Sequence, residues 1–229
     1  MIQKDSTWLG YAIRIPSVLL IIIWGVKIYE IINQTSLADW GILPRNFEGL
    51  RGVFFMPFIH GDIAHAAHNS IPLFVLAGIL IYFYRKTSWF ILVVGTLLTG
   101  LITWLIANKA YHIGASGVIY MLASYIFFGG VFRRSVKLMA LSLLVSFLYG
   151  SMVWGIFPFE YTVQERISWE GHLAGTVVGL FMAYRFRKVQ IESPQKYSWE
   201  VEQELEEEDQ YWMVEEEPQE KKVPFKDLF

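Results

Sequence analysis

Long runs of apolar residues, separated by short polar segments, fill the chain as far as residue 188. A helix that crosses a bilayer needs about 20 predominantly apolar residues, within a range of roughly 17–25. By this measure we place membrane-spanning helices at 14–33, 65–84, 88–107, 116–132, 136–157 and 169–186. The sequence therefore predicts an all-α polytopic membrane protein, built as a bundle of six transmembrane helices.

Two features interrupt the apolar pattern near the first span. Lys27 and Glu30 fall within it at a spacing of i,i+3, so they either form an ion pair or extend toward the membrane surface. The connection 34–64 is long and rich in aromatic residues. We expect part of this connection to lie in the membrane interface rather than in water.

The distribution of charge predicts the orientation of the spans and a division of the chain. Basic residues gather at alternate span ends, at Arg85, Lys86, Arg133, Arg134, Lys137, Arg185, Arg187 and Lys188. Since basic loops favour the cytoplasmic side, both termini are expected in the cytoplasm. Residues 1–188 carry 15 Lys and Arg against 8 Asp and Glu, whereas residues 189–229 carry 4 against 13. We therefore expect a membrane domain over 1–188 and an acidic cytoplasmic tail over 189–229.

Ser116 and His172 stand at matching depth in this arrangement. The second, fourth and sixth spans all begin at the external face, and these two residues lie near the starts of the fourth and sixth. A serine in a transmembrane helix often bonds only to its own backbone. A histidine in a span is costly and indicates a functional site by default. Together the hydroxyl and the imidazole fit a nucleophile and its general base.

The second span contributes two further candidates, His65 and Asn69. Their spacing of i,i+4 places them on one face of a helix. Both donate hydrogen bonds without needing a charge, as an oxyanion hole requires. His68 lies between them in angle and leaves the choice of histidine open, whereas His60 in the preceding loop is expected to be structural. The spans offer no carboxylate at metal-ligand spacing, so we expect neither a metal nor a cofactor.

Glycines shape the surroundings of the serine and the histidine. Gly114 and Gly117 flank Ser116 and leave its hydroxyl accessible. A stripe of small residues at i, i+4 and i+8 borders His172 and permits close contact between helices; it consists of Gly171, Gly175 and Gly179. If the stripe packs against the fourth span, the imidazole reaches the serine.

Tyr120 and Glu170 are the remaining residues near the predicted pair. Tyr120 lies one helical turn after Ser116, so it either supports the imidazole ring of His172 or fills the core as an aromatic residue. Glu170 precedes His172 by two positions, and residues at that spacing do not face each other on a helix. We therefore expect a Ser–His dyad rather than a triad that includes a carboxylate. The absence of cysteine from the chain also excludes a cysteine nucleophile, disulfides and thiolate metal sites.

In combination these residues resemble the rhomboid family of intramembrane serine proteases, over about residues 50–182. His65 and Asn69 match the family's H-x-x-x-N motif, 114–117 match its G-x-S-G, and 171–179 match its G-H-x-x-G-x-x-x-G. The resemblance implies that Ser116 is the nucleophile and His172 the general base. It further implies an oxyanion hole formed by His65, Asn69 and the Ser116 backbone N–H.

The resemblance also implies the fold and the setting. The expected fold is a rhomboid-like bundle in a bacterial cell (inner) membrane. The expected substrates are transmembrane proteins, and the chain is expected to contact membrane lipids and no nucleic acid. Two positions depart from the family pattern, because Leu50-Arg51 replaces its Trp-Arg pair and His68 occupies a position that is usually apolar. A catalytically inactive rhomboid-like protein that binds membrane clients is the main alternative. The acidic tail is either plainly solvated or docks a cytoplasmic partner.

Overall fold

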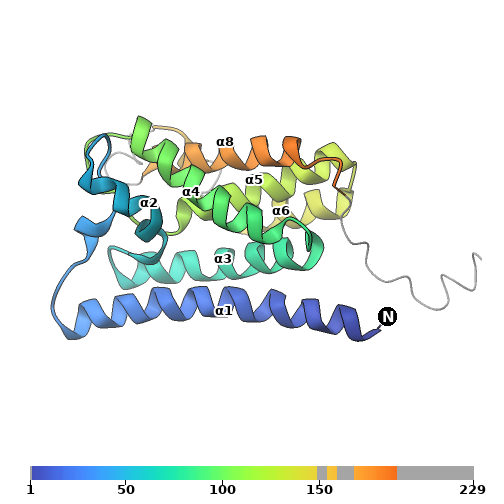
Figure 1. Ribbon diagram of the computed structural model, residues 1–229, viewed down its shortest axis with the longest axis horizontal. Helices are drawn as coiled ribbons and strands as arrows, with labels where there is room; N and C mark the ends of the chain where they lie inside the picture. Colours follow the sequence, from blue (N-terminus) through green and yellow to red (C-terminus); the bar gives the residue numbers. More distant parts are fainter. Residues whose placement is uncertain (1, 149–153, 159–167, 190–229) are drawn as a thin grey trace, which may run out of the picture. The chain divides into compact units, whose positions relative to one another are not determined.

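Helices are the only extended regular elements in the computed structural model, which describes residues 2–148, 154–158 and 168–189. All of these residues belong to one compact unit, Met1–Glu192. The longer helices are α1 (Ile2–Ile32), α3 (Ile63–Phe83), α4 (Ser88–Ile106), α5 (Ser116–Arg133), α6 (Val136–Leu148) and α8 (Trp169–Arg185) (Figure 1). The short ones are η1 (Ala38–Trp40), η2 (Glu48–Arg51), α2 (Gly52–Phe55), η3 (Met56–Phe58) and η4 (Trp154–Ile156).

Four of these helices are long and apolar enough to cross a membrane, namely Thr7–Ile32 within α1 and the whole of α3, α4 and α5. The spans predicted at 65–84, 88–107 and 116–132 agree with α3, α4 and α5 to within two residues. The first helix begins at Ile2, well before the predicted start at residue 14. The described part of the chain is thus helical, with four candidate membrane spans.

The last two predicted spans correspond to shorter helices. The 17 residues of α8 match the predicted span 169–186, but a helix of this length is at the lower limit for crossing a bilayer. The predicted span 136–157 is α-helical over the 13 residues of α6 and 3₁₀-helical over η4, and residues 149–153 lie outside the described ranges. The count of six spans therefore stays a prediction.

The polar pair in α1 is an internal ion pair. Lys27 Nζ lies 2.6 Å from Glu30 Oε2, and both side chains are buried. The pair also fixes the neighbouring chain, because Lys27 Nζ donates to the Gly61 carbonyl oxygen (3.3 Å) and Glu30 Oε1 accepts from the Leu37 backbone N–H (2.7 Å). Of the two alternatives for Lys27 and Glu30, an ion pair or extension toward the membrane surface, the structure shows the ion pair.

The connection between α1 and α3 is folded rather than extended. Ile42 forms two backbone hydrogen bonds with His112 (2.9 and 2.8 Å), and Trp104 Nε1 donates to the Asn46 carbonyl oxygen (2.9 Å). Large aromatic side chains remain on its surface, including Phe47 and Phe54, which are 88% and 59% exposed. Exposed Phe side chains are typical of segments that lie with an apolar face in the membrane interface.

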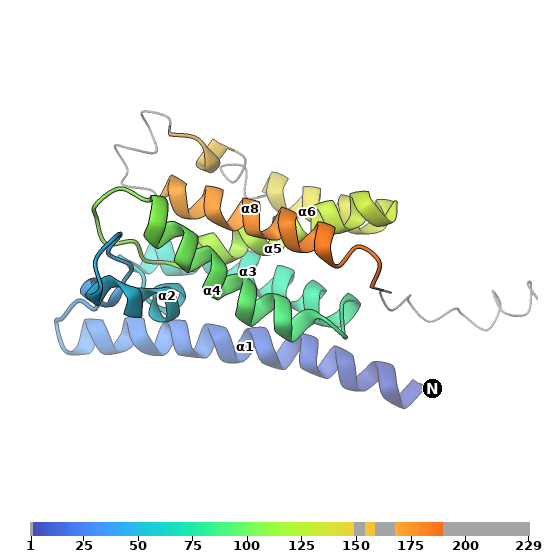
Figure 2. The ribbon, with the colours of Figure 1, turned by 45° about the horizontal axis from the view of Figure 1, so that its top comes forward.

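The helix α5 lies at the centre of the bundle and packs against α3, α4, α6 and α8, whereas α1 packs mainly on α3 (Figure 2). Its closest neighbour is α8, and at two glycines of α8 the backbones of the two helices come into contact. A Cβ atom added at Gly175 would collide with the carbonyl oxygen of Gly117, and one added at Gly179 would collide with that of Met121. Two glycines of the stripe predicted on the last span, Gly175 and Gly179, thus face α5, whereas a Cβ atom at Gly171 would meet Ser168 and Thr103.

We expect Gly175→Ala and Gly179→Ala each to lower the unfolding temperature of the protein in detergent. The new methyl group must push α8 away from α5, and overpacking of this kind costs about 1–3 kcal/mol. Gly25→Ala in α1 is the matched control, because a Cβ atom there meets nothing within 4 Å. Equal unfolding temperatures for the three variants would show that the close approach of α5 and α8 contributes no stability.

Candidate functional site

The site is built around a hydrogen bond between Ser116 and His172. Ser116 is the first residue of α5 and His172 lies in the first turn of α8. The two groups meet with His172 Nε2 2.8 Å from Ser116 Oγ. The other ring nitrogen, Nδ1, lies 2.9 Å from the Gly155 carbonyl oxygen. Because a carbonyl oxygen only accepts, Nδ1 carries the ring hydrogen and Nε2 accepts from the serine hydroxyl.

Tyr120 and Gly155 also hold the imidazole of His172, Tyr120 on one face of the ring and Gly155 at its Nδ1 edge. The ring of Tyr120 stacks on it, with centroids 4.1 Å apart and planes 11° from parallel. Gly155, in η4, has no room for a side chain, since an added Cβ would lie 3.0 Å from His172 Nδ1 and would collide with the Tyr120 hydroxyl. Sequence reasoning missed Gly155, because a backbone carbonyl carries no residue-type signal.

His65 and Asn69 approach the serine from α3. Gly114 has a φ of +105°, and a Cβ there would lie 2.8 Å from His65 Nε2 and 3.6 Å from Asn69 Nδ2. The buried amide nitrogen of Asn69 has no hydrogen-bond partner within the described part of the chain. A buried donor without an acceptor costs about 1–3 kcal/mol. The two side chains therefore bring His65 Nε2 and Asn69 Nδ2 beside Gly114, two residues before Ser116.

The loop before Ser116 has its backbone N–H groups paired with the connection between α1 and α3. The Gly114 N–H donates to the Met56 carbonyl oxygen (2.9 Å), and the Ala115 N–H donates to His60 Nε2 (3.3 Å). Irregular backbone at membrane depth is tolerated only where protein or a watery cavity satisfies it. These hydrogen bonds meet that requirement and fix the start of α5.

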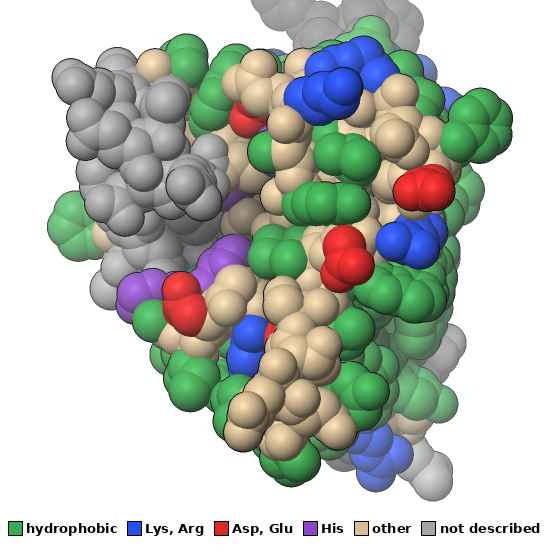
Figure 3. Space-filling view, turned by 90° about the vertical axis from the view of Figure 1, so that its left-hand side faces the viewer, with side chains coloured by type: hydrophobic (Ala, Val, Ile, Leu, Met, Phe, Trp, Pro, Cys, Tyr) green, Lys and Arg blue, Asp and Glu red, His purple; other side chains and the backbone are tan. Residues whose placement is uncertain are grey.

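His60 is buried at this point, and its ring meets the edge of the His65 ring at a centroid distance of 4.9 Å. Burial, and secondarily the neighbouring His65, lower the pKa of His60 from 6.5 to about 3. The imidazole is therefore neutral, as an acceptor of the Ala115 N–H must be. The expectation that His60 has a structural role agrees with this contact. Figure 3 looks onto this end of the molecule, where histidine side chains reach the surface close together.

A second histidine network secures the start of α8. His112 Nε2 lies 2.9 Å from the Asn108 carbonyl oxygen, so it carries the hydrogen, and Nδ1 accepts from the Ser168 hydroxyl at 2.7 Å. The Ser168 oxygen in turn accepts the Gly171 backbone N–H as the N-cap of α8. Sequence reasoning gave His112 and Ser168 no role, because neither stands in a recognisable motif.

Three other residues singled out in the sequence lie apart from the serine. His68 is exposed, whereas His65 is the histidine of this helix that faces Gly114. Glu170 Oε1 accepts from the Asn108 backbone N–H (3.0 Å) rather than from His172. Arg51 Nη2 donates to the Asp39 carbonyl oxygen (3.0 Å), and its guanidinium lies 4.7 Å from the centroid of Trp40. Within the described ranges no group of three or more His, Cys, Asp or Glu side chains is arranged to hold a metal ion.

Comparison with known proteins gives two findings. A family model for the rhomboid domain matches residues 48–189, which include Ser116, His172 and every other residue of the site except Asp39 and Trp40, the two partners of Arg51. The chain is also similar to curated mycobacterial proteins that carry the name uncharacterized protein. It is 33% identical over 169 residues to one from Mycobacterium bovis and to one from Mycobacterium tuberculosis, covering 71% of this chain and 70% of each relative. A Mycobacterium leprae protein is 30% identical over 173 residues, covering 71% of this chain and 66% of the relative.

We expect His60→Phe to lower the unfolding temperature at pH 7, since the buried Ala115 N–H loses its acceptor at a cost of about 1–3 kcal/mol. The variant should also lose part of the acid sensitivity of the protein. Because the fold lowers the pKa of His60, the stability that it contributes is complete above pH 6.5 and is lost as the pH falls toward about 3.

Thermal unfolding at pH 7 and pH 5 measures both effects, with the exposed His68→Phe as the matched control. A His60→Phe protein as stable as the wild type at pH 7, with the same loss of stability at pH 5, would contradict this account of His60.

Proposed function

The chain belongs to the rhomboid family, and we propose that it is an intramembrane serine endopeptidase that cleaves transmembrane segments of membrane proteins. The observation that carries this proposal is the hydrogen bond from Ser116 to His172, in which the ring tautomer is the one that a general base needs. No packing requirement explains a histidine held at both ring nitrogens beside a serine hydroxyl in an apolar bundle.

In the proposed reaction Ser116 Oγ attacks the carbonyl carbon of the scissile peptide bond. Its proton passes to His172 Nε2, and from there to the leaving amine when the C–N bond breaks. Water then attacks the acyl-enzyme ester and regenerates the serine hydroxyl. The Gly155 carbonyl accepts the Nδ1 hydrogen throughout, and it takes the place that a carboxylate has in a triad.

The negative charge that develops on the substrate oxygen needs hydrogen-bond donors in a fixed position. We assign this role to His65 and Asn69 together with the backbone N–H of Ser116. The unpaired buried amide of Asn69 supports the assignment, because an oxyanion would supply the acceptor that this amide lacks in the described part of the chain. Tyr120, Gly114, Gly117 and Gly175 are supporting residues, which position the imidazole ring or let the backbones approach.

The membrane setting follows from the family and from the four apolar helices. We propose in addition that α6 and α8 complete a six-span domain over residues 1–188, with both termini in the cytoplasm and the acidic tail, 189–229, beyond it. The basic residues at alternate span ends support this orientation. It places the serine near the outer face of the bilayer.

An inactive rhomboid-like protein that only binds membrane clients would share the fold. Such a protein has no use for a serine and a histidine in hydrogen-bond contact with a fixed ring tautomer. A reaction with a fluorophosphonate probe, which labels an activated serine, distinguishes the two functions.

We expect Ser116→Ala to abolish both fluorophosphonate labelling and cleavage of a transmembrane peptide in detergent, and His172→Ala to reduce both by several orders of magnitude. The matched control is Ser17→Ala in α1, because the Ser17 hydroxyl donates to the Ile13 carbonyl oxygen of its own helix (2.8 Å). Substantial cleavage by purified Ser116→Ala would rule out the assignment of this residue as the nucleophile.

We expect His65→Ala and Asn69→Ala to slow cleavage by about 10²–10³ each, the usual effect of removing one oxyanion donor. Labelling by the probe should become slower but still go to completion, because the serine and its base are intact. His68→Ala, an exposed histidine on the same helix, serves as the control. Wild-type rates in both variants would mean that His65 and Asn69 are structural and that the oxyanion is bound elsewhere.

A further inference from the structure

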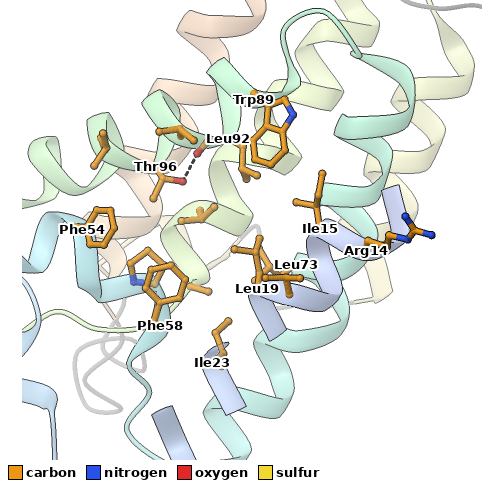
Figure 4. A pocket seen from close by; sticks show the side chains of 16 residues that line it. Arg14, Ile15, Leu19, Ile23, Phe54, Phe58, Leu73, Trp89, Leu92 and Thr96 are labelled. Carbon is orange, nitrogen blue, oxygen red and sulfur yellow. Dashed lines mark hydrogen bonds between the residues drawn. The ribbon is translucent and has the colours of Figure 1, made fainter. Parts of the chain in front are cut away.

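A cavity of about 460 Å³ lies between α1, α2, η3, α3, α4 and α5 (Figure 4). Its volume is within the range of about 300–1,000 Å³ that is typical of ligand sites. None of the four polar candidate residues, His65, Asn69, Ser116 and His172, lines it. The kind of ligand that the cavity binds is therefore inferred from the residues that line it.

The walls of the cavity are almost entirely hydrocarbon and aromatic. Ile15, Leu19, Leu73 and Phe58 project into it (Figure 4). The hydroxyl of Thr96, which also lines it, already donates to the Leu92 carbonyl oxygen at 2.6 Å. A polar ligand would lose its hydration here without gaining hydrogen bonds. The walls fit a hydrocarbon chain.

The depth of the cavity corresponds to one leaflet of a bilayer. Along α1 it extends from Arg14 to Ile23, which is about 13.5 Å at 1.5 Å per residue. The hydrocarbon core of a bilayer is about 30 Å thick. The cavity is therefore about as deep as one leaflet, and its length suits a single acyl chain.

One end of the cavity carries a cation and an indole. Arg14 lies at this rim with its guanidinium directed away from the cavity, and Trp89 lies at the same end (Figure 4). The described residues provide no hydrogen bond or ion pair for Arg14, and Trp89 is 55% exposed. The rim is on the side of the basic loop of Arg85 and Lys86, since Arg85 Cζ lies 5.7 Å from the centroid of Trp8 on α1. Arginine at this depth extends to lipid headgroups, and tryptophan is enriched at the same level.

We propose that this cavity binds one acyl chain of an anionic glycerophospholipid, whose phosphate is held by Arg14 at the rim. The lipid comes from the leaflet on the side of Arg85 and Lys86. Its chain contacts Val118 and Ala115 at the inner wall. Since Ala115 directly precedes Ser116, the bound chain packs against the segment from which α5 begins.

The test uses the full-length protein, purified in detergent, freed of lipid and then titrated with phosphatidylglycerol or phosphatidylcholine of identical acyl chains. Native mass spectrometry counts the lipids retained. We expect one retained phosphatidylglycerol, preferred over phosphatidylcholine. Arg14→Gln should weaken phosphatidylglycerol binding about fivefold, the effect of one cation at an anionic surface, and should remove most of the preference. Lys86→Gln, in the neighbouring basic loop, is the matched control and should keep the preference.

A second pair of variants tests the cavity itself. Val93→Trp and Val18→Trp place an indole in the cavity from two different helices, and both side chains are about half exposed, so the fold should tolerate them. Either variant should lose the retained lipid, whereas Ile21→Trp, on an exposed part of α1 outside the cavity, should keep it. Equal lipid retention by the filled variants and Ile21→Trp, or an unchanged preference in Arg14→Gln, would overturn the proposal.

Discussion

The backbones of α5 and α8 touch at Gly117, Gly175 and Gly179, and the rest of the site depends on this contact. Helices in a membrane gain little from the hydrophobic effect, because lipid is as apolar as their side chains, so close packing and hydrogen bonds between helices hold them together. Here the glycines allow the approach, and the hydroxyl of Ser124 adds a bond to the Thr176 carbonyl oxygen of α8 (2.7 Å). Two rigid helices in fixed register then bring the serine and the histidine at their ends within hydrogen-bond distance.

The buried histidines at this end of the bundle are neutral rings, each with at least one hydrogen-bond partner. Each of three buried histidines has a carbonyl, hydroxyl or backbone N–H partner that suits an uncharged ring: His60 with Ala115, His112 with Ser168 and Asn108, and His172 with Gly155 and Ser116. Isolated ions in an apolar interior cost far more than neutral groups that are hydrogen-bonded. The Gly155 carbonyl orients the imidazole of His172 without a charge, and the acid nearest to it in the sequence, the buried Glu170, accepts from the Asn108 backbone N–H instead.

The sequence predicts the parts of the fold that depend on long apolar runs and on side-chain type. The helices α3, α4 and α5 begin and end within two residues of prediction, because apolar stretches of this length have few alternatives. The start of α1 was missed, since its first turns are polar and carry no membrane signal. The Ser116 and His172 pair could be predicted from the sequence, because two polar side chains at one membrane depth are costly. The role of Gly155 could not be predicted, because every residue has a backbone carbonyl. The partners of Ala115 and Gly114 depend on a long-range fold that no local pattern encodes.

The segment from His112 to Ala115 stands between two environments, the polar groups around Ser116 and the apolar cavity that Ala115 lines. Unpaired backbone at membrane depth is costly, so this segment needs partners that are themselves held in place. All three of its paired N–H groups find them in the connection between α1 and α3, at Ile42, Met56 and His60. That connection is in turn fixed to α1 through Lys27 and to α4 through Trp104. The 3₁₀ and α-helical turns of the connection thus support the start of α5. If the connection shifts against α1, the shift is transmitted to Ser116 through the hydrogen bonds of Gly114 and Ala115.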